Sequence, residues 1–468
     1  MSAPDIDRKV MEGFAALAGD EHMTIVLGAG ASAPSGLPTW DEFAIRVAVR
    51  SGIVATREAA AVLLSKQDQT IVLEAAHARS GDAWPAHLNE ALYGLPTVAA
   101  TPSPLHLAAA GHYAGAPEAT TLATLNFDVL LELALRSTGS PLVVIDTDGD
   151  DEPEAPTVHH LHGAVYNGQE YSAVVGYRDF AELVADPKAW QREFLSSALQ
   201  RGPLLLAGTS YRDPDIRHWL HLIMRDEKPT FPALVTIIRE GLALDRETFA
   251  TIESALASEW ESIGLQALAV QDLADVALVI RELKHAADPG YQPPAERARR
   301  VWDAHTKRFA ELQRDYSVRL ATDSDAIGEA LGVTTHRATL WLANARGKLA
   351  RWASESGQFA AVRQLKLLPT GHDSPWIAGE AIGAEEVKLK DAERDPGVTP
   401  AWRSVLAVPV FVGDGIHPDF ATAVVTFGLS QTAAAVVARE AGWRDAASEL
   451  SAAWGTRLAG VAFGDQPE

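Results

Sequence analysis

Residues 23–32 read MTIVLGAGAS, an apolar run that ends directly on Gly28 and Gly30. A run that is apolar on both faces is typical of a strand inside a covered parallel sheet. Two glycines directly after such a strand allow a sharp bend and a close approach of the backbone to a phosphate group, with the amides of a following helix nearby. The pattern predicts an α/β fold with a nucleotide-binding turn at the end of its first strand.

Further apolar runs alternate with helical stretches as far as residue 285, which predicts a Rossmann-like parallel sheet. These runs lie at 120–125, 141–145, 203–208 and 233–238. A proline-rich segment, 288–296, marks the end of this first domain, so we assign the domain to residues 1–287. Residues 288–355 read as a helical connector, with one long helix over 296–320. Residues 356–468 read as a small α+β domain.

The C-terminal domain is predicted from two strands, 404–412 and 422–430, that are separated by a turn and followed by a closing helix. These strands, with a strand-and-turn segment at 376–383, resemble the central strands of a GAF-like sensor domain. The connector resembles a helix-turn-helix, with Gly332 at the turn. Its second helix would present four cations, namely Arg337, Arg346, Lys348 and Arg351.

Charge and composition exclude several classes of function. The formal net charge is −22, which argues against general binding of nucleic-acid backbones. Cysteine is absent, which excludes disulfides, thiolate zinc sites and a cysteine nucleophile. No apolar run reaches the ~18 residues that a membrane span needs, and the first residues lack the pattern of a signal peptide. We therefore expect a cytoplasmic protein that binds no membrane.

The glycine turn alone does not define a reaction, because any tight turn from a strand to a helix looks similar. A dehydrogenase also carries an acidic residue about 20 positions further on, at the end of a second strand, to hold the adenosine ribose. Here that position falls inside the helical stretch AIRVAVRSG. The sequence therefore disfavours hydride transfer.

Four segments in order narrow the assignment: GAGAS followed by GLPTW (28–40), TLNFD (124–128), HHLHG (159–163) and LLLAGTSYRDPDI (204–216). Each begins or ends at the carboxyl end of an apolar run, where open α/β sheets bind ligands. In this order they resemble the SIR2-like (sirtuin-fold) family as it occurs among bacterial antiphage defence proteins. The resemblance covers about residues 14–285 and implies NAD+ hydrolase activity.

Cleavage of the bond between nicotinamide and ribose needs a fixed ribose, a nucleophile and a base, and passes through an oxocarbenium-like centre. His162 suits the base, since imidazole accepts protons near neutral pH. Asn126 suits the orientation of ribose hydroxyls and water, because its amide both donates and accepts. The resemblance implies that this Asn and this His are the catalytic pair. The structural alternatives are a helix cap for Asn126 and a turn residue for His162.

Further residues of the four segments are expected to contact the dinucleotide. Asp128 would brace the site or cap the next helix, and Ser32 would donate to a phosphate or act as an ordinary helix cap. The expected NAD-binding set is Gly28, Ala29, Gly30, Ser32, Pro38, Trp40, Asp128, Gly208, Thr209 and Ser210. No metal ligand is expected.

Sirtuin deacylases insert a module with two pairs of cysteines around zinc, and this chain has no cysteine. We therefore expect no zinc and no acyl-lysine cleft, so that water is the acceptor. NAD+ would be a substrate, and the products would be nicotinamide and ADP-ribose. The resemblance implies an abortive-infection effector, gated by its C-terminal region, by homo-oligomerisation or by a partner defence protein. The alternatives are a non-catalytic NAD or ADP-ribose sensing module and a nucleotide-regulated DNA-binding regulator.

Overall fold

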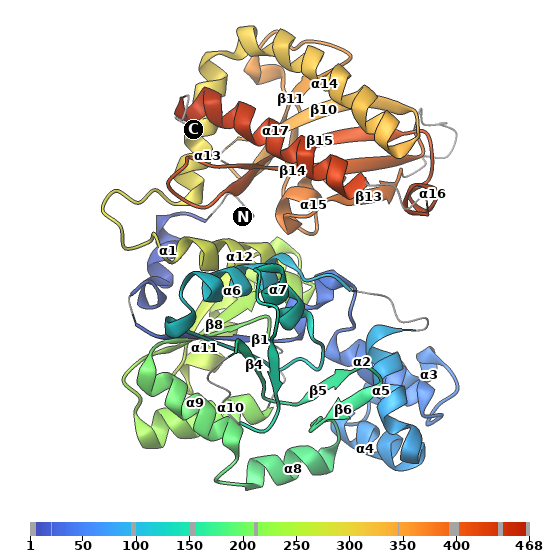
Figure 1. Cartoon of the computed structure of the whole chain (residues 1–468), viewed down its shortest axis with the longest axis vertical. Helices are drawn as coiled ribbons and strands as arrows, with labels where there is room; N and C mark the ends of the chain where they lie inside the picture. Colours follow the sequence, from blue (N-terminus) through green and yellow to red (C-terminus); the bar gives the residue numbers. More distant parts are fainter. Residues whose placement is uncertain are drawn as a thin grey trace. The chain divides into compact units, whose positions relative to one another are not determined.

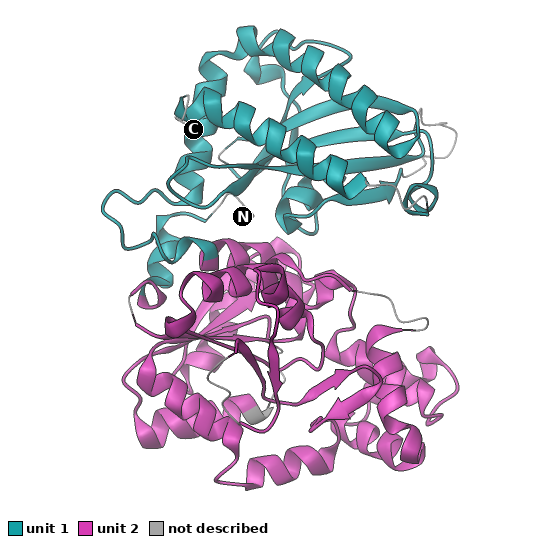
Figure 2. Cartoon of the chain, viewed as in Figure 1, with its two compact units in different colours: residues 1–15, 281–468 teal, residues 16–280 magenta. Residues whose placement is uncertain are grey.

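The chain forms two compact units (Figure 2). The computed structural model describes residues 6–19, 21–94, 100–149, 155–209, 214–344, 346–392, 402–438 and 443–464. Unit 2 consists of residues 16–280, and unit 1 of residues 1–15 together with 281–468.

Unit 2 is built on a seven-stranded sheet in which every pairing between neighbouring strands is parallel (Figure 1). The strand order is β3-β4-β2-β1-β7-β8-β9. The strands are β1 (Met23–Leu27), β2 (Thr120–Thr124), β3 (Val144–Asp146), β4 (Thr157–His160), β7 (Leu204–Ala207), β8 (Ala233–Ile238) and β9 (Gln266–Val270). The predicted α/β class and parallel sheet are confirmed. Strand β9 was missed because its exposed Gln266 and Ala269 interrupt the apolar run.

Strand β1 is the middle strand of the sheet. The next strand along the chain, β2, lies on one side of it, and β7 lies on the other side. The register pairs Leu27 with Thr124 of β2 and with Ala207 of β7, so the three strands end at the same level. Because neighbouring connections diverge here, the carboxyl ends of β1, β2 and β7 surround the place where open α/β sheets bind ligands.

Helices cover both faces of this sheet (Figure 1). One face packs against α9 (Trp190–Arg201), α10 (Pro214–Leu222) and α11 (Arg246–Glu261), whose large buried side chains include Trp219 and Trp260. The remaining large helices of the sheet region are α6 (Pro104–Gly115), α7 (Leu130–Ser137) and α12 (Leu273–Glu282). Because helices cover both faces of the sheet, β1, β7 and β8 are buried along their whole length.

A helical lobe stands beside the carboxyl ends of the strands. It contains α2 (Trp40–Arg50), α3 (Arg57–Leu64), α4 (Gln69–Ser80), α5 (Trp84–Tyr93), α8 (Tyr177–Ala185) and the hairpin of β5 (Ala164–Tyr166) and β6 (Gln169–Tyr171). Helix α2 begins after Thr39, whose hydroxyl accepts from the amide of Glu42. The lobe has its own apolar cluster, in which Phe43, Leu88 and Phe127 are buried.

Unit 1 is built on a six-stranded antiparallel sheet in the order β12-β11-β10-β15-β14-β13. The strands are β10 (Thr335–Ala343), β11 (Lys348–Ser354), β12 (Leu367–Pro369), β13 (Lys388–Asp391), β14 (Ser404–Val412) and β15 (Phe420–Leu429). The helices are α1 (Arg8–Gly13), α13 (Pro294–Lys307), α14 (Phe309–Leu331), α15 (Ile377–Ala384), α16 (Ala433–Val437) and α17 (Trp443–Phe463).

The predicted connector is not a separate segment. Residues 335–354 form the hairpin β10-β11, in which the side chain of Asn344 accepts from the amides of Arg346 and Lys348 and Gly347 takes a positive φ of 69°. The expected helix was therefore wrong, and with it the helix-turn-helix. Local helix propensity lost to pairing with β15, a strand about 85 residues further on.

Two other expectations in this unit were wrong. Residues 376–383 do not form a strand, since α15 buries Ala378, Ala381 and Ile382, a spacing typical of one helix face. The single helix over 296–320 is two helices, because α13 ends at Lys307 and α14 begins at Phe309.

The domain boundaries also differ from the predicted 1–287, 288–355 and 356–468. The first residues belong to unit 1, since Ile6 accepts a backbone hydrogen bond from Ala295 and Arg8 pairs with Glu296 at 3.2 Å. Strands β10 and β15 share one sheet, so the connector and the C-terminal domain are one unit. Among the described helices, none is long and apolar enough to cross a membrane.

Candidate functional site

The glycine turn after β1 packs backbone against backbone on the turn after β7. The amide of Gly30 donates to the carbonyl of Gly208 at 2.8 Å. A Cβ on Gly28 would lie 2.5 Å from the Cα of Thr209, and a Cβ on Gly30 would lie 2.9 Å from the oxygen of Gly208. Gly208 itself has φ +68°. These glycines are therefore required by the contact between two turns, whatever ligand lies above them.

No α-helix starts directly after the glycines, which corrects the expected helix terminus. Two short 3-10 turns, Ala29–Ala31 and Ala33–Ser35, come first, and α2 begins only at Trp40. The amides of Ala31 and Ser32 donate to carbonyls within the turn. The dipole end of a long helix is thus not what faces the pocket here.

The backbone of Asn126 is held in place by a hydrogen bond. Its backbone amide donates to the hydroxyl of Thr124 at 3.0 Å, and that hydroxyl donates to the carbonyl of Leu27 at 3.0 Å. The Thr-x-Asn spacing therefore ties the loop after β2 to the end of β1. This is a local side-chain contact that the sequence pattern already contains.

The Asn126 side chain has a fixed orientation. Its Nδ2 donates to the carbonyl of Gly28 at 3.1 Å and to Oγ of Ser32 at 2.9 Å. Because a carbonyl can only accept, the amide nitrogen must be the atom that faces Gly28. The opposite atom, Oδ1, is buried and has no hydrogen-bond partner. A buried acceptor without a donor is costly, so this oxygen is suited to receive a hydroxyl from a ligand.

Ser32 connects Asn126 with Asp128. Its hydroxyl donates to Oδ2 of Asp128 at 2.7 Å while it accepts from Asn126. It makes no helix-capping hydrogen bond. With its proton directed at Asp128, Ser32 positions Asn126 in this structure and does not form the helix cap that was one of its two expected roles.

Asp128 lies beneath this network and is 4% exposed. Its Oδ1 accepts from the amide of Leu130 at 3.1 Å, at the start of α7. Burial raises the pKa of Asp128 to about 6, although the hydrogen bonds from Ser32 and Leu130 lower it. Since ionised and neutral forms are both accessible near neutrality, the charge under Asn126 depends on pH.

A buried histidine completes the network from the other side. Nδ1 of His106 accepts from the amide of Ser103 at 3.2 Å, so the ring proton lies on Nε2, 3.4 Å from Oγ of Ser32. Burial lowers the pKa of His106 to about 3, which keeps the ring neutral. Sequence reasoning missed this residue, because nothing local links it to the glycine turn.

His162 lies in the turn after β4 and is 5% exposed. Its ring meets the edge of Phe180 with centroids 5.8 Å apart. Gly163 follows with φ +76°, and a Cβ there would lie 2.2 Å from the carbonyl oxygen of Ser172. The His-Gly pair is thus required by a close approach of the backbone, and the histidine ring is presented at the carboxyl end of β4.

His160 and Glu132 form a buried pair behind Asn126. Nε2 of His160 lies 2.6 Å from Oε1 of Glu132, and Nδ1 donates to the carbonyl of Asn126 at 3.0 Å. Burial alone would lower the pKa of His160, but Glu132 and the Asn126 carbonyl raise it. His160 was not among the residues that the sequence analysis assigned to the site. One signal could have found the pair, namely a glutamate on the apolar face of helix α7.

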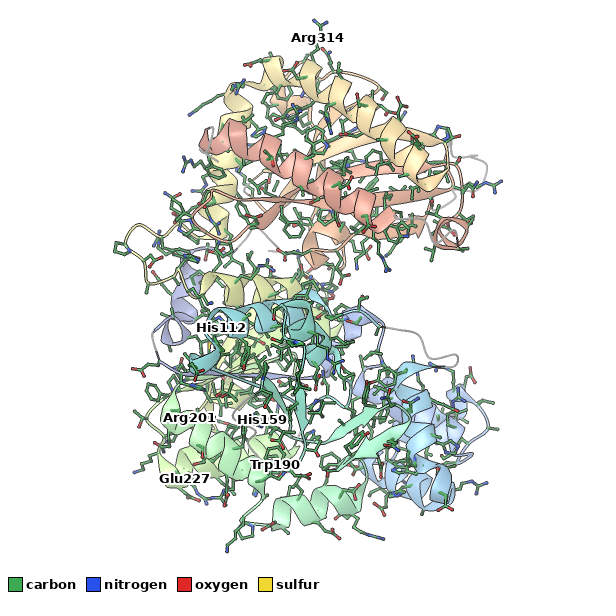
Figure 3. The ribbon with its side chains drawn as sticks, in the orientation of Figure 1. His112, His159, Trp190, Arg201, Glu227 and Arg314 are labelled. Carbon is green, nitrogen blue, oxygen red and sulfur yellow. The ribbon has the colours of Figure 1, made fainter. Side chains whose placement is uncertain are left out.

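The neighbouring His159 faces a different set of side chains. Its Nδ1 lies 2.6 Å from Oδ2 of Asp146, and its ring packs 4.8 Å from that of Phe194, near Trp190 (Figure 3). Because consecutive strand residues point to opposite faces, His159 and His160 cannot serve the same site.

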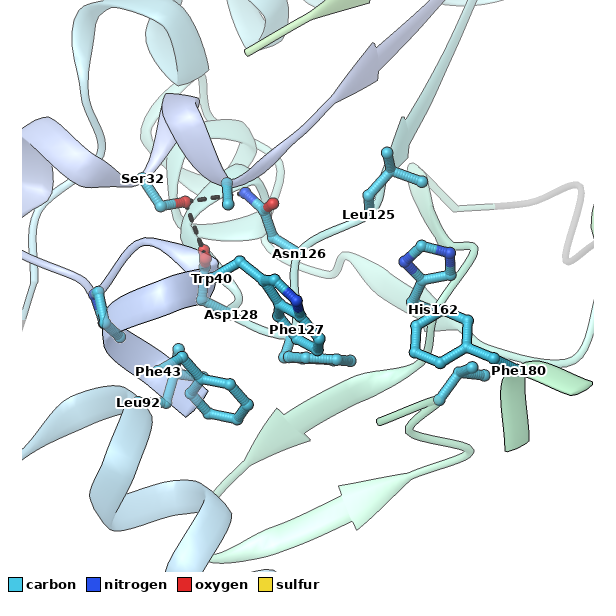
Figure 4. A pocket seen from close by; sticks show the side chains of 13 residues that line it. Ser32, Trp40, Phe43, Leu92, Leu125, Asn126, Phe127, Asp128, His162 and Phe180 are labelled. Carbon is cyan, nitrogen blue, oxygen red and sulfur yellow. Dashed lines mark hydrogen bonds between the residues drawn. The ribbon is translucent and has the colours of Figure 1, made fainter. Parts of the chain in front are cut away.

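Asn126 and His162 line one pocket beside the glycine turn (Figure 4). The predicted residues that share this lining are Ala29, Ser32, Pro38, Trp40, Asn126, Asp128 and His162. Gly28, Gly30, Gly208 and Thr209 are absent from the lining and form the contact between the two turns. Ser210 lies outside the described residues. The enclosed space is about 60 Å³, below the ~300 Å³ of common ligand pockets, so it suits one small group of a larger ligand.

The apolar wall of the pocket was largely missed by the sequence analysis, which named only Pro38 and Trp40 from it. Trp40, Phe43 and Phe127 pack with ring centroids 5.7 to 6.1 Å apart. The other apolar lining residues that the sequence analysis did not name are Leu92, Leu125, Val174 and Phe180. Phe43, Leu92 and Phe180 lie on helices α2, α5 and α8, where apolar residues are typical of core packing.

The fold and pocket define an α/β domain with a ligand site at the carboxyl ends of a parallel sheet. Residues 120–268, about a third of the chain, match the family model of the SIR2-like domain. The matched range contains Asn126, His162 and Gly208 and begins after the glycine turn. Residues 120–268 are thus similar to the SIR2-like domain.

Solved structures of Sir2 homologues resemble the chain at low sequence identity. A Sir2 homologue in complex with NAD is 15% identical over 60% of this chain and 94% of that chain, with a TM-score of 0.32. A Sir2 homologue mutant with ADP-ribose is 15% identical over 61% of this chain and 100% of its own, with a TM-score of 0.31. Sir2Tm bound to a propionylated peptide is 14% identical over 59% and 99%, with a TM-score of 0.27. No curated protein matches the chain.

Proposed function

We propose that unit 2 is an NAD+ glycohydrolase that releases nicotinamide and ADP-ribose. One observation carries the proposal: a fixed amide with an unpartnered oxygen, on Asn126, lines the same pocket as the imidazole of His162. The match of residues 120–268 to the SIR2-like domain supports NAD as the dinucleotide. The specific chemistry follows from the two side chains.

The two groups divide the reaction between them. Oδ1 of Asn126 accepts from a ribose hydroxyl, which holds the sugar while its anomeric carbon gains positive character. The bond between that carbon and the pyridinium nitrogen breaks, its electron pair stays on the nitrogen, and nicotinamide leaves as a neutral molecule. A water oxygen bonds to the same carbon, and His162 takes the water's proton.

Water is the acceptor that these residues favour. The chain has no cysteine, so it has no zinc module of the kind that borders an acyl-lysine cleft in deacylases. The pocket wall is aromatic, and the imidazole of His162 lines it as a candidate base.

The proposal extends to a biological role. The resemblance of the motifs to antiphage defence proteins supports an abortive-infection effector, in which NAD+ depletion arrests an infected cell. Such an activity needs a gate, and either unit 1, whose residues 356–468 resemble a GAF-like sensor domain in their strand pattern, or a partner defence protein would supply it. Assembly into a homo-oligomer is the expected active form.

Nicotinamide release by the purified chain tests the proposed reaction. Wild type, Asn126→Ala and His162→Ala are incubated with NAD+, with Asn89→Ala as an amide control that lies outside the pocket lining. We expect each pocket variant to lose at least about 100-fold in rate, as removal of a positioned catalytic group does, and Asn89→Ala to match wild type. If the purified chain shows no activity, each of the four chains is expressed in cells, and the NAD+ content of the cells is compared after phage infection. Equal cleavage by all four chains would remove the assignment.

A further inference from the structure

Unit 1 contains a pocket on the sheet face that carries α15. The opposite face packs against α14 and α17 through a continuous apolar cluster that includes Tyr316 and Trp454. On the α15 face, the helix covers only part of the sheet around Ala378 and Ile382. The uncovered part is hollow, with a volume of about 270 Å³, near the lower end of the ~300–1,000 Å³ of ligand pockets.

The pocket is cationic although the chain is strongly acidic. Arg337, Arg351 and Lys366 line it together with His336, and its described lining includes no carboxylate. Within the described part of the chain, no ion pair joins any of the three permanent cations to an acid. The chain has a net charge of −22, so three cations in one pocket without an acidic partner among the described residues depart from its overall charge balance.

The fold itself brings two of these cations together. The pairing of β10 with β15 is irregular between His336 and Thr339, and Arg337, inside this bulge, has a positive φ of 52°. A bulge redirects a side chain, and a non-glycine residue in this region stores strain. Burial lowers the pKa of Arg351, and the charge of Arg337 lowers it further. Two like charges held in one hollow are stabilised by an anion between them.

Three tryptophans share the same hollow. Trp341 forms its floor, held by a hydrogen bond of 3.0 Å from Nε1 to the hydroxyl of Thr426. Lys366 lies 3.7 Å over the ring of Trp376, and Arg337 lies 5.4 Å from the ring centre of Trp402. Trp376 is 43% exposed, so part of its ring is accessible from the pocket side.

We propose that this pocket binds a nucleotide: a planar aromatic ring against the tryptophans, with its phosphate on Arg337, Arg351 and Lys366. Aromatic rings stack on bases of any sequence, and guanidinium groups bind phosphate oxygens in pairs. Neither a neutral ring nor an inorganic anion uses both halves of the lining. The site is separate from the pocket in unit 2 and does not depend on NAD+ cleavage.

Calorimetric titration of the full chain tests the proposal. The probes are the four ribonucleoside 5′-monophosphates and 5′-diphosphates, inorganic phosphate and adenosine. The pocket variants are Arg351→Gln, Arg337→Gln and Trp376→Ala. The control is Arg314→Gln, which removes an equal charge from the exposed surface of α14 (Figure 3). Thermal melting of each chain shows whether it is folded.

We expect at least one nucleotide to bind at least tenfold more tightly than phosphate or adenosine. Each pocket variant should weaken that binding by at least tenfold while melting within a few degrees of wild type, and Arg314→Gln should bind as wild type does. Three results would overturn the proposal: no nucleotide bound, binding unchanged in the two arginine variants, or inorganic phosphate binding as tightly as any nucleotide. Binding that survives in the variants would belong to unit 2.

Discussion

The two units carry pockets of opposite electrostatic design. In unit 2 the side chains of Asn126, Ser32 and Asp128 are joined by hydrogen bonds, and Oδ1 of Asn126 is left without a partner. In unit 1 three cations share a hollow with no acid in its described lining. The first pocket is pre-organised by hydrogen bonds, which favours reaction geometry. The second is held under like-charge repulsion, which favours capture of an anion. Polar side chains that bond to one another suit a site that positions a substrate, and cations that lack an acidic partner suit a site that binds an anion.

The largest expected effect comes from the buried pair behind Asn126. Replacing Glu132 by Ala leaves His160 without its carboxylate in a fully buried position. Breaking such a pair costs about 3–5 kcal/mol of unfolding free energy. Urea unfolding of Glu132→Ala measures this cost, with Glu261→Ala, an exposed residue of α11, as the control. A loss no larger than that of the control would show that unit 2 does not depend on its internal pairing.

The next effect is a dependence of stability on pH. Burial raises the pKa of Asp128 from 3.8 to about 6. The folded chain therefore binds this proton more tightly than the unfolded chain, and the stabilisation is fully present below pH ~4 and lost as pH rises through about 6. Between pH 4.5 and 7 the loss is about 2 kcal/mol. Comparison of urea midpoints for wild type and Asp128→Asn isolates this term, and identical pH profiles for the two chains would refute it.

Ser32→Ala tests the link between stability and geometry. The change leaves Asp128 without its hydroxyl donor and Asn126 with one acceptor instead of two. We expect a loss of about 1–3 kcal/mol and, on the proposed function, a fall in nicotinamide release of at least tenfold. The control is Ser35→Ala in the same segment, since the hydroxyl of Ser35 makes no hydrogen bond. Equal behaviour of the two variants would contradict a positioning role for Ser32.

The smallest effect has the opposite sign and concerns unit 1. Arg351→Gln removes one of the cations that share the unit 1 pocket, so at low salt it should stabilise the chain by less than about 1 kcal/mol. Inorganic phosphate should raise the melting temperature of wild type more than that of the variant. If Arg351→Gln destabilises the chain at low salt, the pocket is not under like-charge repulsion.

The strand-end motifs allowed much of the unit 2 pocket to be predicted. Asn126 and His162 follow their strands directly, and a parallel sheet brings such positions to one edge. The contacts behind them could not be predicted, because Glu132 and His160 are 28 residues apart and meet only after α7 packs on the sheet. The glycines were predicted as a ligand contact, and nothing in the sequence indicated that they also lie against the turn after β7 and are required there.

The unit 1 pocket shows where sequence reasoning fails. Residues 335–354 are rich in Ala, Leu and Arg and favour a helix locally. Pairing with β15 places them in a sheet instead, so that Arg337 and Arg351, predicted on one recognition helix, line one pocket from neighbouring strands. The two arginines come to share a pocket only through strand pairings between residues that are distant in the chain.

A structure of the chain with a non-cleavable NAD+ analogue tests the central claim most directly. We predict that a ribose hydroxyl next to the nicotinamide lies within hydrogen-bond distance of Oδ1 of Asn126 and that the ring of His162 faces the same ribose. An analogue bound elsewhere, or with this ribose turned away from both side chains, would contradict the claim.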